Sequence, residues 1–236
     1  NVDSDKSLSI RSFLIGSISQ NISTAKNVLE SQDVMSTISA CRKLGIKIEK
    51  IQPKHYKIYG KGLGSFYTKK NAILNLGNSG TLARLLIGIL SSTPNIQVKI
   101  LGDHSLNKRN MKKLIILMNK FGASFLPKKK YTFPLQLISS KMPIGINYDA
   151  GVSAQLKSAV ILAGLNSYGN TTIKENISIP NSLFKKFISK VKNRKNDEIK
   201  QASILFLINL RIKKYKTIDV NTEYINPSKP TPFSKF

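Results

Sequence analysis

The stretch Leu76-Gly-Asn-Ser-Gly-Thr-Leu-Ala-Arg84 decides how the rest of this sequence is interpreted. Two glycines flank Asn78 and Ser79, and an apolar run over residues 85–90 follows directly. Glycine lets the backbone approach a ligand closely, and a loop that opens a helix points free backbone N–H groups and the positive end of the helix dipole at one place. The stretch therefore suits an anion, although an ordinary Asn, Ser or Thr helix cap with glycines in the turn would have the same pattern.

The composition indicates a globular protein in a reducing compartment. The chain has 236 residues, of which 41% are hydrophobic, enough for one large domain or two with a sizeable core. No apolar run approaches the roughly 20 residues that span a bilayer, and no basic-then-apolar leader signals secretion. The single cysteine, Cys41, cannot form an internal disulfide and lies in a helical pattern, which favours a buried, inert thiol. We expect a cytoplasmic protein with no membrane partner.

The formal net charge of +26 has two interpretations. A strongly basic chain can bind nucleic acid. Alternatively, the lysines are spread over every solvated face, where their field would attract small anionic substrates. Lysines occur in almost every segment, few aromatic residues interleave with them, and no nucleic-acid motif is present. The second interpretation, with no nucleic-acid partner, is the one that we favour.

Three segments of the chain share one plan. Each has a helical pattern ending near a marker glycine, then a strand, a second helix, and a strand or hairpin. The marker glycines Gly16, Gly88 and Gly164 lie 72 and 76 residues apart. Helices on one side of short sheets, repeated three times, predict an α/β (α+β) domain with a quasi-threefold axis.

The end of the chain departs from this regularity. A fourth copy is predicted to start near Ala202, followed by a strand over residues 215–220. The third unit would then lack its closing strands, with a polar, basic patch over residues 186–200 in their place. Among the local helix signals, Asp33 is predicted to cap a helix that begins near Val34.

Four motifs in order carry a resemblance to a known family. They are Asp5-Lys-Ser-Leu-Ser-Ile-Arg-Ser-Phe13, Gly77-Asn-Ser-Gly-Thr81 with Arg84, Gly102-Asp-His-Ser-Leu-Asn-Lys-Arg109, and Ser153-Ala-Gln-Leu-Lys-Ser-Ala159. In these the chain resembles the EPSP synthases, or 3-phosphoshikimate 1-carboxyvinyltransferases, strongly over residues 1 to about 178 and weakly over 199–228. The resemblance implies an enolpyruvyl transferase fold of two domains, each of three βαβαββ-type units, with the active site between them. Residues 1–12 and 199–236 would belong to part of a first domain, and residues 13–190 would form a second domain whose third unit is shortened.

The resemblance also implies an activity and a set of substrate-binding residues. Such enzymes move the enolpyruvyl group of phosphoenolpyruvate onto the 5-hydroxyl of shikimate 3-phosphate and release phosphate, with no metal or other cofactor. The residues that it assigns to substrate binding are Lys6, Ser7, Arg11, Asn78, Gly80, Arg109, Ser153, Ala154, Gln155 and Ser178.

Each of these residues has an implied role. Lys6 would contact both substrates, and Ser7 and Arg11 would hold the shikimate part. Asn78 and the Gly80 backbone would meet phosphoenolpyruvate, whose phosphate or carboxylate Arg109 would clamp. Ser153 and Ala154 would bind the 3-phosphate at a helix start, with Ser178 as a further phosphate contact, and Gln155 would hydrogen-bond across both substrates. Arg84 is expected to brace the fold and Thr81 to cap a helix.

The departures from the family keep other interpretations open. Asn226-Pro-Ser-Lys229 resembles a segment that lies mid-chain in the family, and the expected acid–base residues lie beyond it, so Lys6 is the one catalytic candidate here. The chain alone would then have little activity, as a monomeric fragment or as one half of a split enzyme completed by a C-terminal chain. A related UDP-N-acetylglucosamine enolpyruvyl transferase would have Lys-Asn in place of Lys6-Ser7, and a basic nucleic-acid-binding protein is the alternative from another class. His55 and His104 are too far apart in sequence, without nearby Cys or acidic clusters, to predict a metal site.

Overall fold

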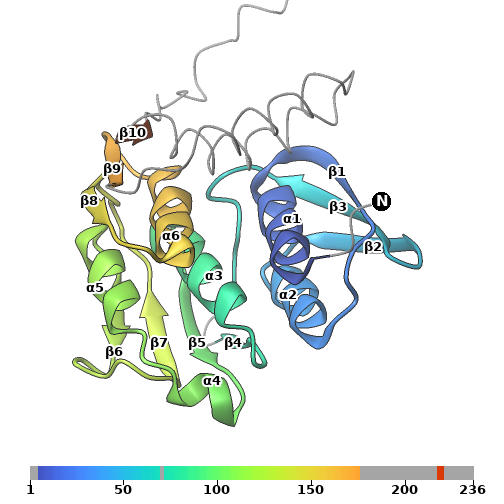
Figure 1. Cartoon of the computed structure of the whole chain (residues 1–236), viewed down its shortest axis with the longest axis horizontal. Helices are drawn as coiled ribbons and strands as arrows, with labels where there is room; N and C mark the ends of the chain where they lie inside the picture. Colours follow the sequence, from blue (N-terminus) through green and yellow to red (C-terminus); the bar gives the residue numbers. More distant parts are fainter. Residues whose placement is uncertain (1–4, 70–71, 176–216, 221–236) are drawn as a thin grey trace, which may run out of the picture.

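The structure is a computed structural model that describes residues 5–69, 72–175 and 217–220, and its helices are interspersed among short runs of strands (Figure 1). The elements of the first part are α1 (Lys6–Ile18), β1 (Gln20–Lys26), α2 (Gln32–Lys43), β2 (Lys47–Gln52), β3 (His55–Lys61) and β4 (Ala72–Asn75). They are followed by α3 (Gly80–Ser92), β5 (Gln97–Leu101), α4 (His104–Lys108), α5 (Lys112–Lys120), β6 (Ser124–Leu126) and β7 (Leu135–Ile138). The last elements are β8 (Asn147–Ala150), α6 (Ala154–Gly164), β9 (Thr171–Glu175) and β10 (Thr217–Val220).

Three sheets repeat one arrangement of strands. In the second unit the order is β4-β5-β7-β6, with β4 parallel to β5 and the other pairs antiparallel. In the first unit β1, β3 and β2 form the matching antiparallel part. In the third unit β8 runs parallel to β9. Helices α3 and α6 each connect a parallel strand pair, so the predicted order of helix, strand, helix and hairpin is confirmed in the first two units.

The cap residues of helices α1, α3 and α6 mark equivalent positions in the three units. The side chains of Asp5, Ser79 and Ser153 each accept a hydrogen bond from the backbone N–H three residues on, at 2.7, 3.2 and 3.4 Å. These caps stand 74 residues apart at both steps. A side chain at this position satisfies a backbone donor that the helix itself leaves free.

The marker glycines do not follow this 74-residue period, because Gly88 contacts a different part of the fold from Gly16 and Gly164. A Cβ on Gly16 would lie 2.9 Å from Ile58 of the same unit, and one on Gly164 would lie 2.8 Å from Thr171 of the same unit. A Cβ on Gly88 would instead lie 2.5 Å from the carbonyl oxygen of Ala159 in α6. Gly88 therefore allows the backbones of α3 and α6 to cross closely.

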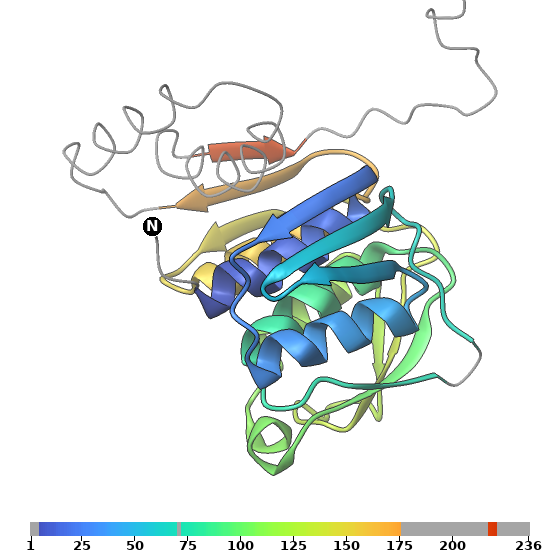
Figure 2. The ribbon, with the colours of Figure 1, turned by 90° about the vertical axis from the view of Figure 1, so that its right-hand side faces the viewer.

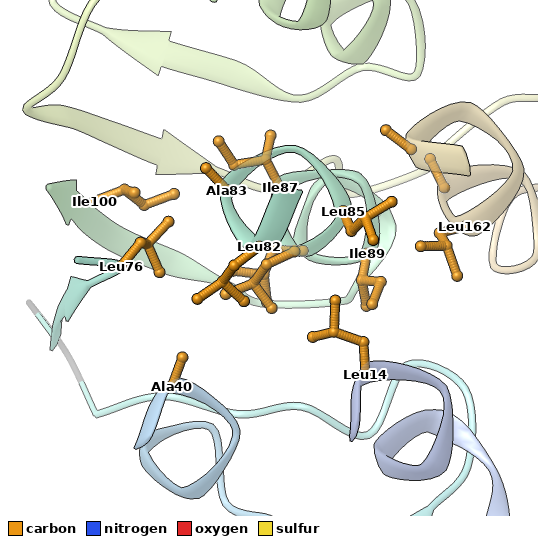
Figure 3. Close-up of a cluster of buried hydrophobic side chains, with 14 of the residues drawn as sticks. Leu14, Ala40, Leu76, Leu82, Ala83, Leu85, Ile87, Ile89, Ile100 and Leu162 are labelled. Carbon is orange, nitrogen blue, oxygen red and sulfur yellow. The ribbon is translucent and has the colours of Figure 1, made fainter. Parts of the chain in front are cut away.

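Helix α3 lies at the centre of the core. All of its residues except Arg84 are buried. Figure 3 shows Leu82, Leu85 and neighbouring side chains of α3 surrounded by Leu14 of α1 and Leu162 of α6, with strands β4 and β5 on the other side. Burying one such side chain contributes about 1.5–3 kcal/mol, so the packing fixes α3 and the loop that precedes it. No helix in the described part of the chain is long and apolar enough to cross a bilayer.

Strand β10 differs from its predicted place. It pairs antiparallel with β9, with Thr217 opposite Lys174, in the way that β7 pairs with β5. The predicted strand at the end of the chain is therefore present and pairs with the third unit. The helix predicted to begin a fourth copy near Ala202 lies outside the described residues. The patch at residues 186–200 lies outside the described residues.

Two observations disagree with parts of the predicted division into two domains. Helix α1 runs without a break through residues 12 and 13, where the first boundary was placed. The pairing of β10 joins residues 217–220 to the third unit, although they were assigned to the first domain. The remainder of segment 199–236 lies outside the described residues, and the division as a whole stays a prediction.

Candidate functional site

The loop before α3 has the form that its glycines suggested. Gly77 adopts a φ of +58°, in the left-handed region that favours glycine. Its N–H donates to Asn75 Oδ1 at 3.0 Å, and its carbonyl accepts from the Asp103 N–H at 2.9 Å. The chain thereby turns from β4 into α3, where Ser79 forms the cap. The N-terminus of α3 is held in place by hydrogen bonds on both sides.

Two arginines meet at the first residue of α3. A Cβ on Gly80 would lie 2.6 Å from Nη1 of Arg109 and 2.9 Å from Nη1 of Arg84. Arg109 Nη2 donates to Asn78 Oδ1 at 2.6 Å, and Arg84 Nη1 donates to the Gly80 carbonyl at 3.0 Å. The absence of a side chain on Gly80 thus leaves room for two guanidinium groups beside a helix N-terminus.

The pair of arginines has no counter-ion in the described part of the chain. The ion pairs found there join Lys6 to Asp33, Lys47 to Glu49 and Lys50 to Glu30. Burial and the neighbouring charge of Arg109 lower the pKa of Arg84. An anion bound between the two guanidinium groups would remove this repulsion and would also meet the positive end of the α3 dipole.

Helix α6 joins this cluster through Gln155. The Gln155 Oε1 accepts from Arg84 Nη1 at 2.8 Å, and its Nε2 donates to Thr81 Oγ1 at 2.9 Å. Ser153 caps α6, Ala154 is exposed, and Val152 before them is 88% exposed. The N-terminus of α6 is therefore open to solvent and linked to that of α3.

Helix α1 differs from α3 and α6 in that its cap residue carries a negative charge, whereas theirs are serines. The carboxylate of Asp5 already bonds the first turn of α1. The half-exposed Lys6 ammonium lies 3.0 Å from Asp33 Oδ2, and Arg11 Nη1 donates to the Ser7 carbonyl at 3.2 Å. Burial lowers the pKa of Arg11, against the opposing effect of Asp5. Figure 1 shows α1, α3 and α6 side by side and starting at the same end of the molecule, and Figure 2 shows the starts of α1 and α6 close together.

The structure brings part of the predicted set into direct contact. Asn78, Gly80 and Arg109 form one group, and Gln155 joins it through Arg84. The other predicted residues, Lys6, Ser7, Arg11, Ser153 and Ala154, lie on the starts of the neighbouring helices. Ser178 lies outside the described residues.

Three site residues were given other roles by the sequence patterns. Arg84 was expected to brace the fold, and its bonds to the Gly80 carbonyl and to Gln155 agree with that role. Its place one helical turn after Gly80 also sets its guanidinium beside that of Arg109. Thr81 does not cap α3, since Ser79 does, and it bonds Gln155 instead. Asp33 was expected to cap α2, but that helix begins after Ser31 and Asp33 pairs with Lys6.

No cluster of three or more metal-ligating side chains is found among the described residues. His55 begins β3 and His104 begins α4, so the two histidines belong to different units. The polar groups gathered at the starts of α3 and α6 are side-chain cations, amides and hydroxyls.

Comparison with known proteins gives a consistent picture. A family model described as EPSP synthase (3-phosphoshikimate 1-carboxyvinyltransferase) matches residues 1–202. The chain is 40% identical to 3-phosphoshikimate 1-carboxyvinyltransferases from Magnetococcus marinus over 172 residues and from Bacillus cytotoxicus over 177 residues, covering 72% and 74% of this chain. The solved EPSP synthase from Acinetobacter baumannii superposes with a TM-score of 0.69 at 34% identity, over 76% of this chain and 41% of that one. The chain spans 38% and 41% of the length of the two curated relatives.

Proposed function

Because this chain belongs to the EPSP synthase family, we propose that it serves in transferring the enolpyruvyl group of phosphoenolpyruvate to the 5-hydroxyl of shikimate 3-phosphate. The products would be 5-enolpyruvylshikimate 3-phosphate and phosphate, on the route to chorismate and the aromatic amino acids. The observation that carries the proposal is the arginine pair at Gly80, Arg84 and Arg109, which has no carboxylate partner in the described structure.

Phosphoenolpyruvate matches this pair in charge and shape. It carries a phosphate and a carboxylate on the same carbon of one small molecule. A guanidinium group is planar and always charged, and it binds either group through two parallel hydrogen bonds. Arg84 and Arg109 are both half-buried, so their interaction with an anion is screened less than at an open surface. The N–H groups at the start of α3 add further donors.

Shikimate 3-phosphate would bind across the starts of α1 and α6. The open N-terminus of α6 at Ser153 and Ala154 suits its phosphate. Lys6, Ser7 and Arg11 on α1 suit its carboxylate and hydroxyl groups. Gln155 stands between the two proposed subsites, because it is on α6 and is bonded to Arg84 and Thr81 of α3. Ser178 is proposed as a further phosphate contact.

The described residues bind and orient these reactants more than they move protons. Lys6 would place a compact positive charge beside the enol, held by Asp33. The arginine pair stabilises charge on phosphate and carboxylate, but no described carboxylate accompanies it to act as a general base. We propose that this part of the chain supplies the binding half of the active site, within a monomer or together with a complementing C-terminal chain. Its proposed setting is the cytoplasm, where the fully buried Cys41, whose pKa burial raises to about 11, stays unreactive.

Calorimetric titration with each substrate tests the proposal. Replacing Arg109 by Met removes the charge but keeps the length of the side chain. It should weaken phosphoenolpyruvate binding roughly 10- to 100-fold, since a charge-assisted hydrogen bond contributes about 1.5–3 kcal/mol. Lys120→Met, at the exposed far end of α5, is the matched control and should bind as the native chain does. Equal affinities for the Arg109→Met variant and the native chain would rule the arginine pair out as the binding site.

A further inference from the structure

The amide of Gln155 is held at both ends by side chains of α3. Its Oε1 accepts from Arg84 Nη1 at 2.8 Å, and its Nε2 donates to Thr81 Oγ1 at 2.9 Å. Arginine has only donors, so the amide oxygen is the only end of Gln155 that can face Arg84. The amino end of the amide is thereby directed to Thr81.

The opposite orientation of the amide would be strongly disfavoured. It would set the NH₂ group of Gln155 against the N–H groups of a guanidinium that already bonds the Gly80 carbonyl. Donors would then face donors at a half-buried site, where an unpaired polar group is costly. Arg84 thus selects which end of the amide points to Thr81, and Thr81 holds that end in place.

Thr81 is well suited to hold the amide. It is only 7% exposed, and its hydroxyl oxygen finds its partner in Gln155. Helices α3 and α6 pack with their backbones in close contact, because Gly88 has no side chain to separate α3 from Ala159. The separation between the Thr81 hydroxyl and the Gln155 side chain is therefore fixed by the core.

We propose that Thr81 is a positioning residue that, with Arg84, locks the Gln155 amide so that it offers its second N–H to a substrate. One Nε2 hydrogen goes to Thr81, and the other has no partner in the described part of the chain. The locked amide favours a ligand oxygen that accepts a hydrogen bond, as in a carboxylate or a phosphate, over a group that can only donate, such as an ammonium. This inference rests on the proposed function, and it assigns to Thr81 a role in substrate selection beyond that of a helix residue.

The side-chain NH₂ signals of Gln155 in an ¹⁵N-labelled chain report the lock directly. In the native chain we expect two well-separated proton signals, one of which shifts when phosphoenolpyruvate is added. Thr81→Val keeps the shape but lacks the oxygen, so the signal of the N–H that faces Thr81 should shift and the separation between the two signals should approach that of an unconstrained glutamine. Affinity for phosphoenolpyruvate should fall roughly 2- to 12-fold, the equivalent of one net hydrogen bond. Thr81→Ser restores the hydroxyl and should restore both readouts.

Thr93→Val is the matched control. Thr93 is also buried, at the other end of α3, and its hydroxyl bonds only the Ile89 carbonyl in the described structure. This variant should leave the Gln155 signals unchanged. Gln155 signals that are the same in Thr81→Val as in the native chain would overturn the lock, whatever the chain binds. Separated signals that no phosphoenolpyruvate or shikimate 3-phosphate shifts would overturn the proposed function, and with it the role in selection, while the lock itself would stand.

Discussion

Gly80→Ala is the smallest change that disturbs the arginine pair. The added methyl would lie 2.6 Å from Arg109 Nη1 and 2.9 Å from Arg84 Nη1, closer than such atoms approach in proteins, so both guanidinium groups must move. Their movement would strain the bonds of Arg109 to Asn78 and of Arg84 to Gln155. It would also withdraw both cations from the anion between them. Losing the equivalent of one charge-assisted hydrogen bond costs about 1.5–3 kcal/mol, so affinity for phosphoenolpyruvate should fall roughly 10- to 100-fold.

The fold should tolerate this substitution. The atoms in the way are the ends of two flexible side chains, and alanine favours a helix over glycine by about 0.5–1 kcal/mol. We therefore expect an unfolding free energy within about 1 kcal/mol of the native value, measured by urea denaturation beside the calorimetric titration. Gly151→Ala is the control, because a Cβ there would meet nothing within 4 Å. Native affinity for phosphoenolpyruvate in Gly80→Ala would refute the role assigned to the arginine pair.

Three further predictions concern the core, acid stability and Lys6. Gly88→Ala would place a methyl 2.5 Å from the Ala159 carbonyl oxygen and should destabilise the chain by about 1–3 kcal/mol; an unchanged thermal midpoint would disprove the close crossing of α3 and α6. Tyr56, Lys50 and the Lys54 N–H lower the pKa of Glu30 to about 2 from an ordinary 4.5. Because the pKa of Glu30 is lower in the folded chain, Glu30 stabilises the fold above about pH 4.5 and loses that effect as the pH falls towards 2. The unfolding free energy of Glu30→Gln should therefore depend less on acid pH than that of the native chain. Identical pH dependence in the two chains would contradict this role of Glu30. Asp33→Asn should change the unfolding free energy by less than about 1 kcal/mol but weaken shikimate 3-phosphate binding in calorimetry, since Lys6 loses its partner at 3.0 Å; native affinity would show that Asp33 does not position Lys6.

Local patterns were enough to predict the repeated helices and strands. Apolar periodicity and cap residues depend on neighbours in sequence, and the resulting α/β fold is confirmed by the match to EPSP synthase structures. The true period of 74 residues was also present in the caps Asp5, Ser79 and Ser153. The spacings of the marker glycines did not show this period, because the position of Gly88 is set by its close contact with α6 and not by the repeat. The pairing of β10 with β9 joins segments more than 40 residues apart, and no local pattern specifies it.

The site shows the same division between local and distant information. Ser153 was indicated by the family resemblance, whereas Gly80 and Asn78 could be singled out from the sequence, because a loop that opens a helix has its own pattern. The role of Arg84 could not, because it depends on Gln155, 71 positions away. Asp33 was assigned to a cap because acidic residues are common at helix starts, whereas its partner Lys6 comes from another helix. Residues that act across two helices become visible only when the helices are packed.

The most direct test of the account is a crystal structure of the chain with phosphoenolpyruvate. We expect phosphate or carboxylate oxygens about 2.7–2.9 Å from guanidinium nitrogens of both Arg84 and Arg109, beside the start of α3. Phosphoenolpyruvate bound elsewhere, with both arginines left without an anion, would contradict it.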